Sequence, residues 1–284
     1  MRKAALIATI GLTAIGCGAG ELMPSQPGGR DEKGGAGAAP VPPAGGTGGA
    51  AGAAVPPGPG IALVTNADGW LEPNAAGAVG AWWSTGDYYG EDGTPGAGSC
   101  PNAGFPMSGC STLTTPTPGM WFRPDPAGGE MCTSGIAAQV LMGNDGQFAW
   151  SAIWGNIVGF NLATPDSGPA PAVGNYDAPA HGITGFAFNI DGVLPFGHLR
   201  VLVTTADNHT DSAYWDGAAM DLSPYSGPGR YAIRWPEVGG PLYLGGAPPF
   251  DPTKIEAIGF HVVSRETEAA PYAFCISNVA LLTN

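Results

Sequence analysis

The sequence predicts an all-β domain, a β-sandwich, that follows an N-terminal export signal and a long flexible segment. Only 12% of the 284 residues are charged, whereas glycine and proline number 48 and 29. A chain of this composition has few helix formers and many turns. Its apolar residues lie in short β-branched and aromatic runs between turn residues, which is the pattern of strands. We therefore expect an all-β domain of short strands joined by many turns.

The chain begins with a signal for export. Met1, Arg2 and Lys3 form a charged start, residues 4–15 are apolar, and small residues follow. These are the parts of a secretory signal. An apolar run of about a dozen residues is too short to cross a hydrocarbon core of about 30 Å as a helix.

The end of this signal resembles the lipobox of bacterial lipoproteins. The tetrapeptide Ala14-Ile15-Gly16-Cys17 places a cysteine where that family carries lipid and begins the mature protein, although Ala14 stands where leucine is usual. The resemblance implies a signal peptide over residues 1–16 and a lipid anchor on Cys17. It also implies localisation in the bacterial cell envelope, at the outer membrane or the cell surface. A secreted protein cut near Ala14 or Gly16 is the alternative.

Residues 17–60 predict a disordered tether. They are rich in glycine, alanine and proline, hold a charged cluster at residues 30–33 and show no hydrophobic periodicity. Such a segment cannot bury enough apolar surface to fold. A coil of this length spans roughly 35 to 40 Å, which would lift a domain off a membrane surface.

Residues 61–284 are expected to form one domain of ordinary size for a β-sandwich. Strands are predicted from β-branched and aromatic runs at residues 61–64, 80–84, 136–142, 156–162, 183–190, 199–205, 231–235, 255–264 and 272–282. Asp-Gly pairs, of which there are five, mark turns. One helical turn is expected at residues 251–254, because Asp251 suits the N-cap and Pro252 the first helical position.

The acidity of the chain excludes one class of partner. Lysine and arginine number 10 and aspartate and glutamate 23, so the net charge is -13. Electrostatic repulsion opposes binding to phosphate backbones. We therefore expect no nucleic acid partner, and the charge has the simpler alternative role of keeping a surface protein soluble.

The cysteines predict disulfides. Of five cysteines, four remain for the domain if Cys17 carries lipid. Disulfides are the default in an exported chain, and four cysteines allow three pairings. Cys100 and Cys110 bracket a short loop and are expected to pair, which leaves Cys132 for Cys275, although the spacing does not settle the pairing. A zinc site is the competing use, but no Cys-x-x-Cys or Cys/His spacing supports it.

The order of several motifs resembles a family of domains. The motifs are Trp82-Trp83-Ser84-Thr85-Gly86-Asp87, Met131-Cys132-Thr133-Ser134-Gly135-Ile136-Ala137-Ala138, Trp154-Gly155-Asn156-Ile157-Val158-Gly159-Phe160-Asn161-Leu162, Tyr176-Asp177-Ala178 before Gly182-Ile183-Thr184-Gly185-Phe186, Phe250-Asp251-Pro252-Thr253-Lys254-Ile255 and Phe274-Cys275-Ile276-Ser277-Asn278-Val279. They are similar to those of galactose-binding-like jelly rolls, close to carbohydrate-binding modules, of exported bacterial lipoproteins. The resemblance covers nearly all of residues 61–284 and implies a jelly-roll sandwich with a carbohydrate ligand. Because the shared positions are mostly structural, it specifies the fold more closely than the ligand.

A loop at residues 205–221 is the first candidate ligand site. Sugars bind by stacking on an aromatic face and by hydrogen bonds to planar polar groups. The loop interleaves both kinds of side chain, namely Asp207, Asn208, His209, Asp211, Tyr214, Trp215 and Asp216. A solvated loop whose aspartates make turns and whose Trp215 covers the core is the alternative.

A second candidate ligand site comprises Trp82, Trp83, Asp87 and Tyr88. Side chains alternate along a strand, so Trp82 and Trp83 must point to opposite faces, one into the core and the other outward or into a groove. The outward tryptophan is the more informative one for ligand binding.

The family resemblance also implies a structural calcium ion. Related jelly rolls hold one between the first strand region and the last, through carboxylate and carbonyl oxygens. The matching positions here are Asp68, Glu72 and Asn278. Ser277-Asn278 stands in place of the family's usual acidic pair, which weakens this ligand set. No other cofactor is expected.

Signatures of common enzymes are missing. The chain has no Gly-x-Ser-x-Gly, no His-Glu-x-x-His and no Gly-rich phosphate loop after a strand. The two resemblances and the aromatic and acidic loop at residues 205–221 instead imply a non-catalytic lipoprotein of the cell envelope that binds a carbohydrate or an envelope polysaccharide. A structural or protein-interaction module of the envelope is the main alternative. A polysaccharide hydrolase or lyase would need converging carboxylates, for which Asp207 and Asp211 are the first pair to test.

Overall fold

The computed structural model describes residues 59–89, 94–115, 130–164, 174–193, 199–205, 218–221, 228–238 and 250–284. The chain divides into two units, Met1–Gly48 and Gly49–Asn284, and all described residues belong to the second. The predicted signal peptide, Cys17 and nearly all of the predicted tether lie outside the described residues. Within the described ranges, no helix has the length and apolarity needed to cross a membrane.

Two antiparallel sheets make up the domain. The six-stranded sheet has the order β3 (Thr112–Thr115), β4 (Met131–Ala137), β11 (Ala270–Thr283), β6 (Ile183–Val193) and β9 (Gly229–Arg234), with β1 (Gly60–Ala62) paired to β11. The five-stranded sheet has the order β2 (Trp82–Gly86), β5 (Gly155–Asn161), β10 (Ile255–Val263), β7 (Leu199–Thr205) and β8 (Ala218–Asp221). Apart from the pairs β3–β4 and β7–β8, neighbouring strands of each sheet are not consecutive in sequence, so the chain passes repeatedly between the two sheets. The predicted all-β jelly-roll sandwich is confirmed.

Helical structure is brief in the described ranges. The elements are α1 (Ser99–Asn102) and three 3-10 turns, Met107–Gly109, Pro179–His181 and Trp235–Glu237. The expected helical turn at residues 251–254 is instead a hydrogen-bonded turn. Asp251 Oδ1 accepts hydrogen bonds from the N–H and the hydroxyl of Thr253. Asp251 thus serves as a turn former, because the next residues enter strand β10 rather than continue a helix.

Alternating side chains of the two sheets build one core. The fully or almost fully buried members include Val158, Phe160, Val201, Ile258 and Phe260 from the five-stranded sheet and Phe186, Phe188, Ile190, Phe274 and Leu281 from the six-stranded sheet. Phe188 meets Phe260 across the sheets, with ring centroids 4.8 Å apart in an edge-to-face arrangement. Each such side chain contributes about 1.5 to 3 kcal/mol of burial free energy.

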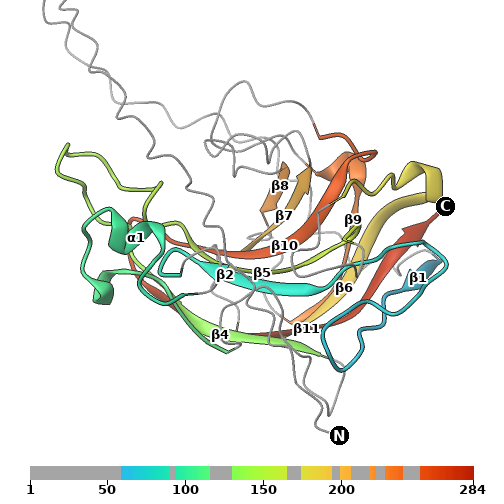
Figure 1. The fold of residues 1–284 in the computed structure, drawn as a ribbon, viewed down its shortest axis with the longest axis horizontal. Coiled ribbons are helices and arrows are strands. Elements are labelled where there is room, and N and C mark those ends of the chain that lie inside the picture. The colour runs from blue at the N-terminus through green and yellow to red at the C-terminus, as the bar shows by residue number, and fades with distance from the viewer. Residues whose placement is uncertain are drawn as a thin grey trace, which may run out of the picture. The chain divides into compact units, whose positions relative to one another are not determined.

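The sandwich is curved. Figure 1 shows both sheets bending in the same direction, with the five-stranded sheet on the inside of the bend. The outer face of the five-stranded sheet, which points away from the core, is therefore concave.

Strand prediction succeeded where apolar residues dominate. The run at residues 199–205 matches β7, and the observed bounds of β5, β6, β10 and β11 lie close to those predicted. The strand predicted at residues 136–142 is wrong in position, because β4 is Met131–Ala137. In β4, the segment Cys132-Thr133-Ser134-Gly135 consists of small and mostly polar residues. It forms a strand because it pairs with β11 and not because of its own composition. β3 and β8 were not predicted, for the same reason.

Both disulfides have the expected pairing. Cys100 bonds to Cys110, and Cys132 bonds to Cys275. Cys132 and Cys275 lie directly opposite each other on β4 and β11, and their bond joins positions separated by 143 residues. Their partly exposed side chains contrast with the buried Cys100 and Cys110.

Candidate functional site

The two adjacent tryptophans of β2 lie on opposite faces of the five-stranded sheet. Trp82 is 2% exposed and packs in the core, with its ring 4.8 Å from that of Phe160. Its indole N–H donates to Thr65 Oγ1 at 3.1 Å. Trp82 is therefore a structural residue, which corrects its assignment to a ligand site.

Trp83 lies on the concave outer face and is partly exposed. It stands opposite Gly159 of β5, which in turn stands opposite Gly259 of β10. A Cβ atom built on Gly159 would come within 2.8 Å of Trp83 Cζ2, and one on Gly259 within 3.8 Å of Trp83 Cη2. The indole thus extends across two strands over a floor of glycines. At Gly159 only a residue without a side chain leaves room for the ring, whereas a Cβ atom at Gly259 would be in ordinary van der Waals contact with it.

Asn161 holds the polar edge of this ring. The indole N–H of Trp83 donates to Asn161 Oδ1 at 2.9 Å. Asn161 lies two residues beyond Gly159 on β5, so it faces the same side of the sheet. Sequence analysis missed Asn161 as a site residue. Its sequence neighbours carry no signal for this contact, and only the pairing of β2 with β5 brings it to Trp83.

Further side chains of the concave face surround the platform, by which we mean Trp83, Gly159, Gly259 and Asn161. Strand register places Thr85, Ile157, Ala257, Leu202 and Thr204 beside it. None of these five is charged. The site therefore combines an aromatic surface with uncharged hydroxyl and amide groups.

His261 of β10 and Arg200 of β7 are register partners on the same face, two residues from Gly259 and Leu202 respectively. Both are buried. Burial, with help from the charge of Arg200, lowers the pKa of His261 to about 3. The imidazole is therefore neutral at physiological pH. Its Nε2 lies 2.9 Å from the carbonyl oxygen of Trp154. This contact links β10 to the residue that precedes β5.

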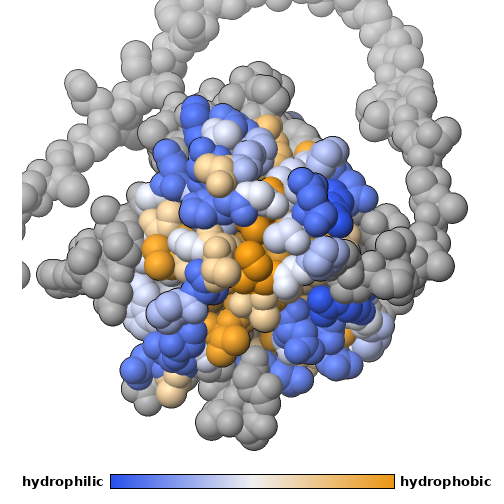
Figure 2. Space-filling view, turned by 90° about the vertical axis from the view of Figure 1, so that its right-hand side faces the viewer, coloured by the Kyte–Doolittle hydropathy of each residue, from blue (hydrophilic) through white to orange (hydrophobic). Residues whose placement is uncertain are grey.

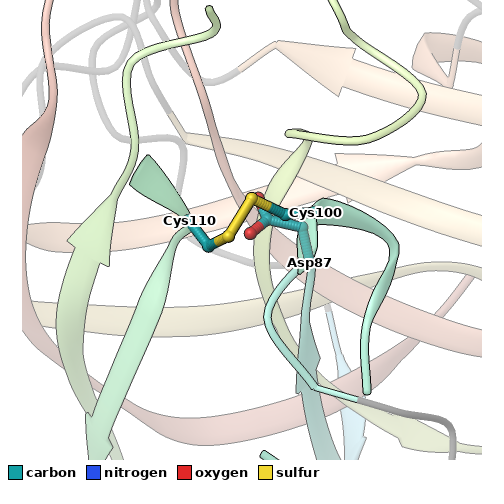
Figure 3. Close-up of side chains that lie close together, drawn as sticks. All are labelled: Asp87, Cys100 and Cys110. Carbon is teal, nitrogen blue, oxygen red and sulfur yellow. A yellow bond between two sulfur atoms is a disulfide. The ribbon is translucent and has the colours of Figure 1, made fainter. Parts of the chain in front are cut away.

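Asp87 lies inside the protein, which corrects its assignment to a ligand site. It is 0% exposed, and Figure 3 shows its carboxylate beside the Cys100–Cys110 disulfide. Oδ1 accepts a hydrogen bond from the N–H of Ser111 at 2.8 Å, and Oδ2 accepts from Ser111 Oγ at 2.7 Å and from the N–H of Gly155 at 2.8 Å. Burial raises the pKa of Asp87 to about 6 despite these hydrogen bonds. Asp87 thus ties the end of β2 to β5 and to the disulfide loop.

Tyr88 belongs to the loop end of the sandwich. Its hydroxyl donates to Met107 Sδ at 3.6 Å, and its ring meets Tyr89 edge-to-face. The four residues of the second predicted site therefore do not converge. Only Trp83 lies on the concave face, because strand alternation and the turn after β2 send the other three elsewhere.

The first predicted site, with Asp207, Asn208, His209, Asp211, Tyr214, Trp215 and Asp216, lies outside the described residues. The strands that flank it belong to the five-stranded sheet. Thr204 of β7 pairs with Ala257, which pairs with Asn161. β7 therefore ends at the Asn161 end of the concave face. Its role in binding stays a prediction.

Of the three predicted calcium ligands, Asn278 lines a small pocket, whereas Asp68 and Glu72 do not. Asp68 is at the tip of a turn, where its N–H donates to Asn66 Oδ1, and Glu72 lies on the returning arm. A pocket between this segment and β11 is lined by Leu63, Thr65, Leu71, Trp82, Met131, Phe160, Ile276, Ser277, Asn278 and Val279. No carboxylate lines it, whereas calcium prefers carboxylate oxygens. This pocket therefore lacks the ligands that calcium prefers. Calcium binding by Asp68, Glu72 and Asn278 stays a prediction.

Metal binding by cysteine is also not supported. In the described ranges, the groups of three or more potential metal ligands are Asp87 with Cys100 and Cys110, and Glu130 with Cys132 and Cys275. Each group contains a disulfide, whose sulfur atoms are not thiolates.

Comparisons with known proteins gave distant structural likenesses. No protein-family model and no curated protein matches the chain. The chain is similar to a family 11 carbohydrate-binding module from Clostridium thermocellum in complex with a beta-1,3-1,4-mixed-linked tetrasaccharide, with 11% identity, 79% of this chain and 96% of that chain covered, and a TM-score of 0.36.

Two further solved structures are similar to parts of the chain. A family 11 carbohydrate-binding module of a cellulosomal cellulase of Clostridium thermocellum is 12% identical, with coverage of 61% of this chain and 81% of that chain and a TM-score of 0.32. The adhesin domain of Lys-gingipain from Porphyromonas gingivalis is 10% identical, with coverage of 54% and 74% and a TM-score of 0.21. The solved structures that this chain resembles thus include carbohydrate-binding modules of family 11.

Proposed function

We propose that this protein is a non-catalytic carbohydrate-binding lipoprotein of the bacterial cell envelope, and that the Trp83 platform is its sugar-binding site. The observation that carries the proposal is the position of Trp83. A large aromatic ring lies across two glycines on the concave face and remains partly exposed. Trp82, by contrast, is 2% exposed.

The chemistry of the platform suits a sugar. Pyranose rings present apolar C–H groups that pack on an aromatic face, and hydroxyls that pair with amide and hydroxyl groups. Trp83 supplies the face, while Asn161 and Thr85 supply the polar groups beside it. The net charge of -13 disfavours polyanions and leaves neutral glycans as the better ligands.

Replacement of Trp83 with alanine is expected to weaken glycan binding at least about 100-fold, since most of the contact area of the platform is lost. The measurement is a glycan array followed by calorimetry, using the chain from residue 17 with Cys17→Ser so that it stays soluble. Trp150→Ala is the matched control, because Trp150 is 36% exposed in the segment between β4 and β5. It should bind as the parent does.

Two outcomes of this experiment decide on the proposed site. Loss of binding in Trp83→Ala alone, with an unchanged circular dichroism spectrum, supports the proposed site. Retained binding in Trp83→Ala contradicts it. Arms with calcium and with a chelator test the predicted calcium at the same time, because a structural ion would lower affinity or stability on removal.

The lipid anchor is the second part of the proposal and rests on the sequence around Cys17. The full chain, expressed in a Gram-negative host, is expected to incorporate labelled palmitate and to sediment with membranes. Cys17→Ser should abolish both, because no other thiol precedes the domain. A Cys17→Ser chain that still sediments with membranes in high salt would refute anchoring through this residue.

A protein-interaction module is the second candidate function, favoured by exposed apolar side chains around α1 and the segment between β4 and β5. Met107, Met142, Phe148 and Trp150 are between 36% and 61% exposed. On the opposite end of the sandwich, shown in Figure 2, apolar residues form a narrow strip between polar areas. If the folded protein binds no glycan on the array, this second function is favoured.

A further inference from the structure

We propose that Asn161 is the specificity-determining residue of the platform, with a separate task for each atom of its amide. Oδ1 fixes the plane of the Trp83 ring, and Nδ2 donates a hydrogen bond to a hydroxyl or ring oxygen of the bound sugar. The second task rests on the proposed function, whereas the first is a property of the unliganded protein.

The orientation of the amide follows from the donor it meets. An indole N–H can only donate, so the atom of Asn161 at 2.9 Å from Trp83 Nε1 must be the carbonyl oxygen Oδ1. The amide nitrogen Nδ2 then points the other way around the planar group. It carries two N–H donors beside the edge of the aromatic ring.

Those donors are available to a ligand. No hydrogen-bond partner of Nδ2 occurs among the described residues, and Nδ2 is not one of the buried side-chain atoms that lack a partner. Asn161 as a whole is 9% exposed. A sugar oxygen at this place would replace water at a donor that is already oriented.

The backbone of Asn161 is held firmly. Its N–H donates to the carbonyl of Ala81 at 3.1 Å, and it pairs with Ala257 on the other side. A Cβ atom on Gly80 would lie 2.1 Å from the carbonyl oxygen of Asn161, so the two backbones are in close contact. The amide is thus presented from a rigid strand, which limits the cost of ordering it when a ligand binds.

Three variants of the soluble chain separate the two tasks. Asn161→Asp keeps an oxygen acceptor for the indole but has no N–H donor. Asn161→Ala has neither. Thr204→Ala is the control on the same face, because its hydroxyl contacts the carbonyl of Ala257 at 3.4 Å and has no contact with the indole N–H. Two quantities are measured: hydrogen exchange of the Trp83 indole N–H by NMR, and affinity for the glycans that the array identifies.

The positioning task is tested without any ligand. We expect indole exchange to accelerate at least about 10-fold in Asn161→Ala and to stay within about twofold of the parent in Asn161→Asp and Thr204→Ala. An unchanged exchange rate in Asn161→Ala overturns the positioning role, whatever the array shows.

The donor task is tested by affinity. We expect Asn161→Asp to bind at least about 10-fold more weakly although its indole stays in place, and Thr204→Ala to bind within about threefold of the parent. Parent affinity in Asn161→Asp overturns the donor role while leaving the platform intact. Retained binding in Trp83→Ala would instead overturn the platform itself, so the two failures are distinguishable.

Discussion

Replacement of Cys132 and Cys275 together with alanine is expected to lower the free energy of unfolding by about 3 to 5 kcal/mol, because the disulfide shortens the unfolded chain across 143 residues. Both side chains are partly exposed on the outer face of the six-stranded sheet, so alanine leaves no buried cavity there. Seven register pairs still join β4 to β11. The loss should therefore come from the greater freedom of the unfolded state.

Chemical denaturation of the soluble chain, followed by tryptophan fluorescence, measures this effect. The circular dichroism spectrum should be unchanged in the absence of denaturant. Reduction of the parent protein is a poor substitute, since it would also open the Cys100–Cys110 bond beside Asp87. A loss below about 1 kcal/mol would show that the unfolded chain gains little freedom from the missing bond.

Asp87 is expected to make the protein less stable as the pH rises from about 4 to about 6. Its pKa is raised from 3.8 to about 6 in the folded state, so folding takes up a proton between these values. The contribution of Asp87 to the free energy of unfolding is therefore complete below about pH 4 and is lost above about pH 6. The change amounts to about 2 to 3 kcal/mol, because a tenfold difference in proton affinity between the folded and unfolded states corresponds to about 1.4 kcal/mol.

The readout is the difference between the stability curves of the parent and of Asp87→Asn, measured at several values of pH. A difference is needed because His261, whose pKa is lowered to about 3, acts in the opposite direction. The unfolded protein protonates this histidine below pH 6.5, so its contribution to stability falls with falling pH. Parallel curves for the parent and Asp87→Asn would show that the carboxylate does not take up a proton on folding.

The candidate site shows which structural features can be predicted from the sequence. Alternation along β2 required Trp82 and Trp83 to face opposite sides, but it did not say which one enters the core. That choice depends on which face of the sheet meets the second sheet. Asn161 and the two glycines of the platform carry no local signal at all, since their roles exist only when β2, β5 and β10 lie in register.

Asp87 was misplaced for a related reason. A carboxylate after an aromatic pair is expected to be an exposed polar group, because isolated carboxylates are seldom fully buried. Here the N–H groups of Ser111 and Gly155, from separate parts of the chain, supply the hydrogen bonds that make burial possible. No sequence pattern shows that these donors converge.

By itself, the sequence determined that the domain is all-β, that its long apolar runs form strands and that Cys100 and Cys110 are near enough to pair. These features depend on composition and on contacts between residues close in the chain. The tertiary structure alone decided that polar runs such as Cys132-Thr133-Ser134-Gly135 become strands, that Trp83 and not Trp82 faces outward and that Asn161 holds its ring. Such features are set by pairing between distant segments, where hydrogen bonding and burial outweigh local preference.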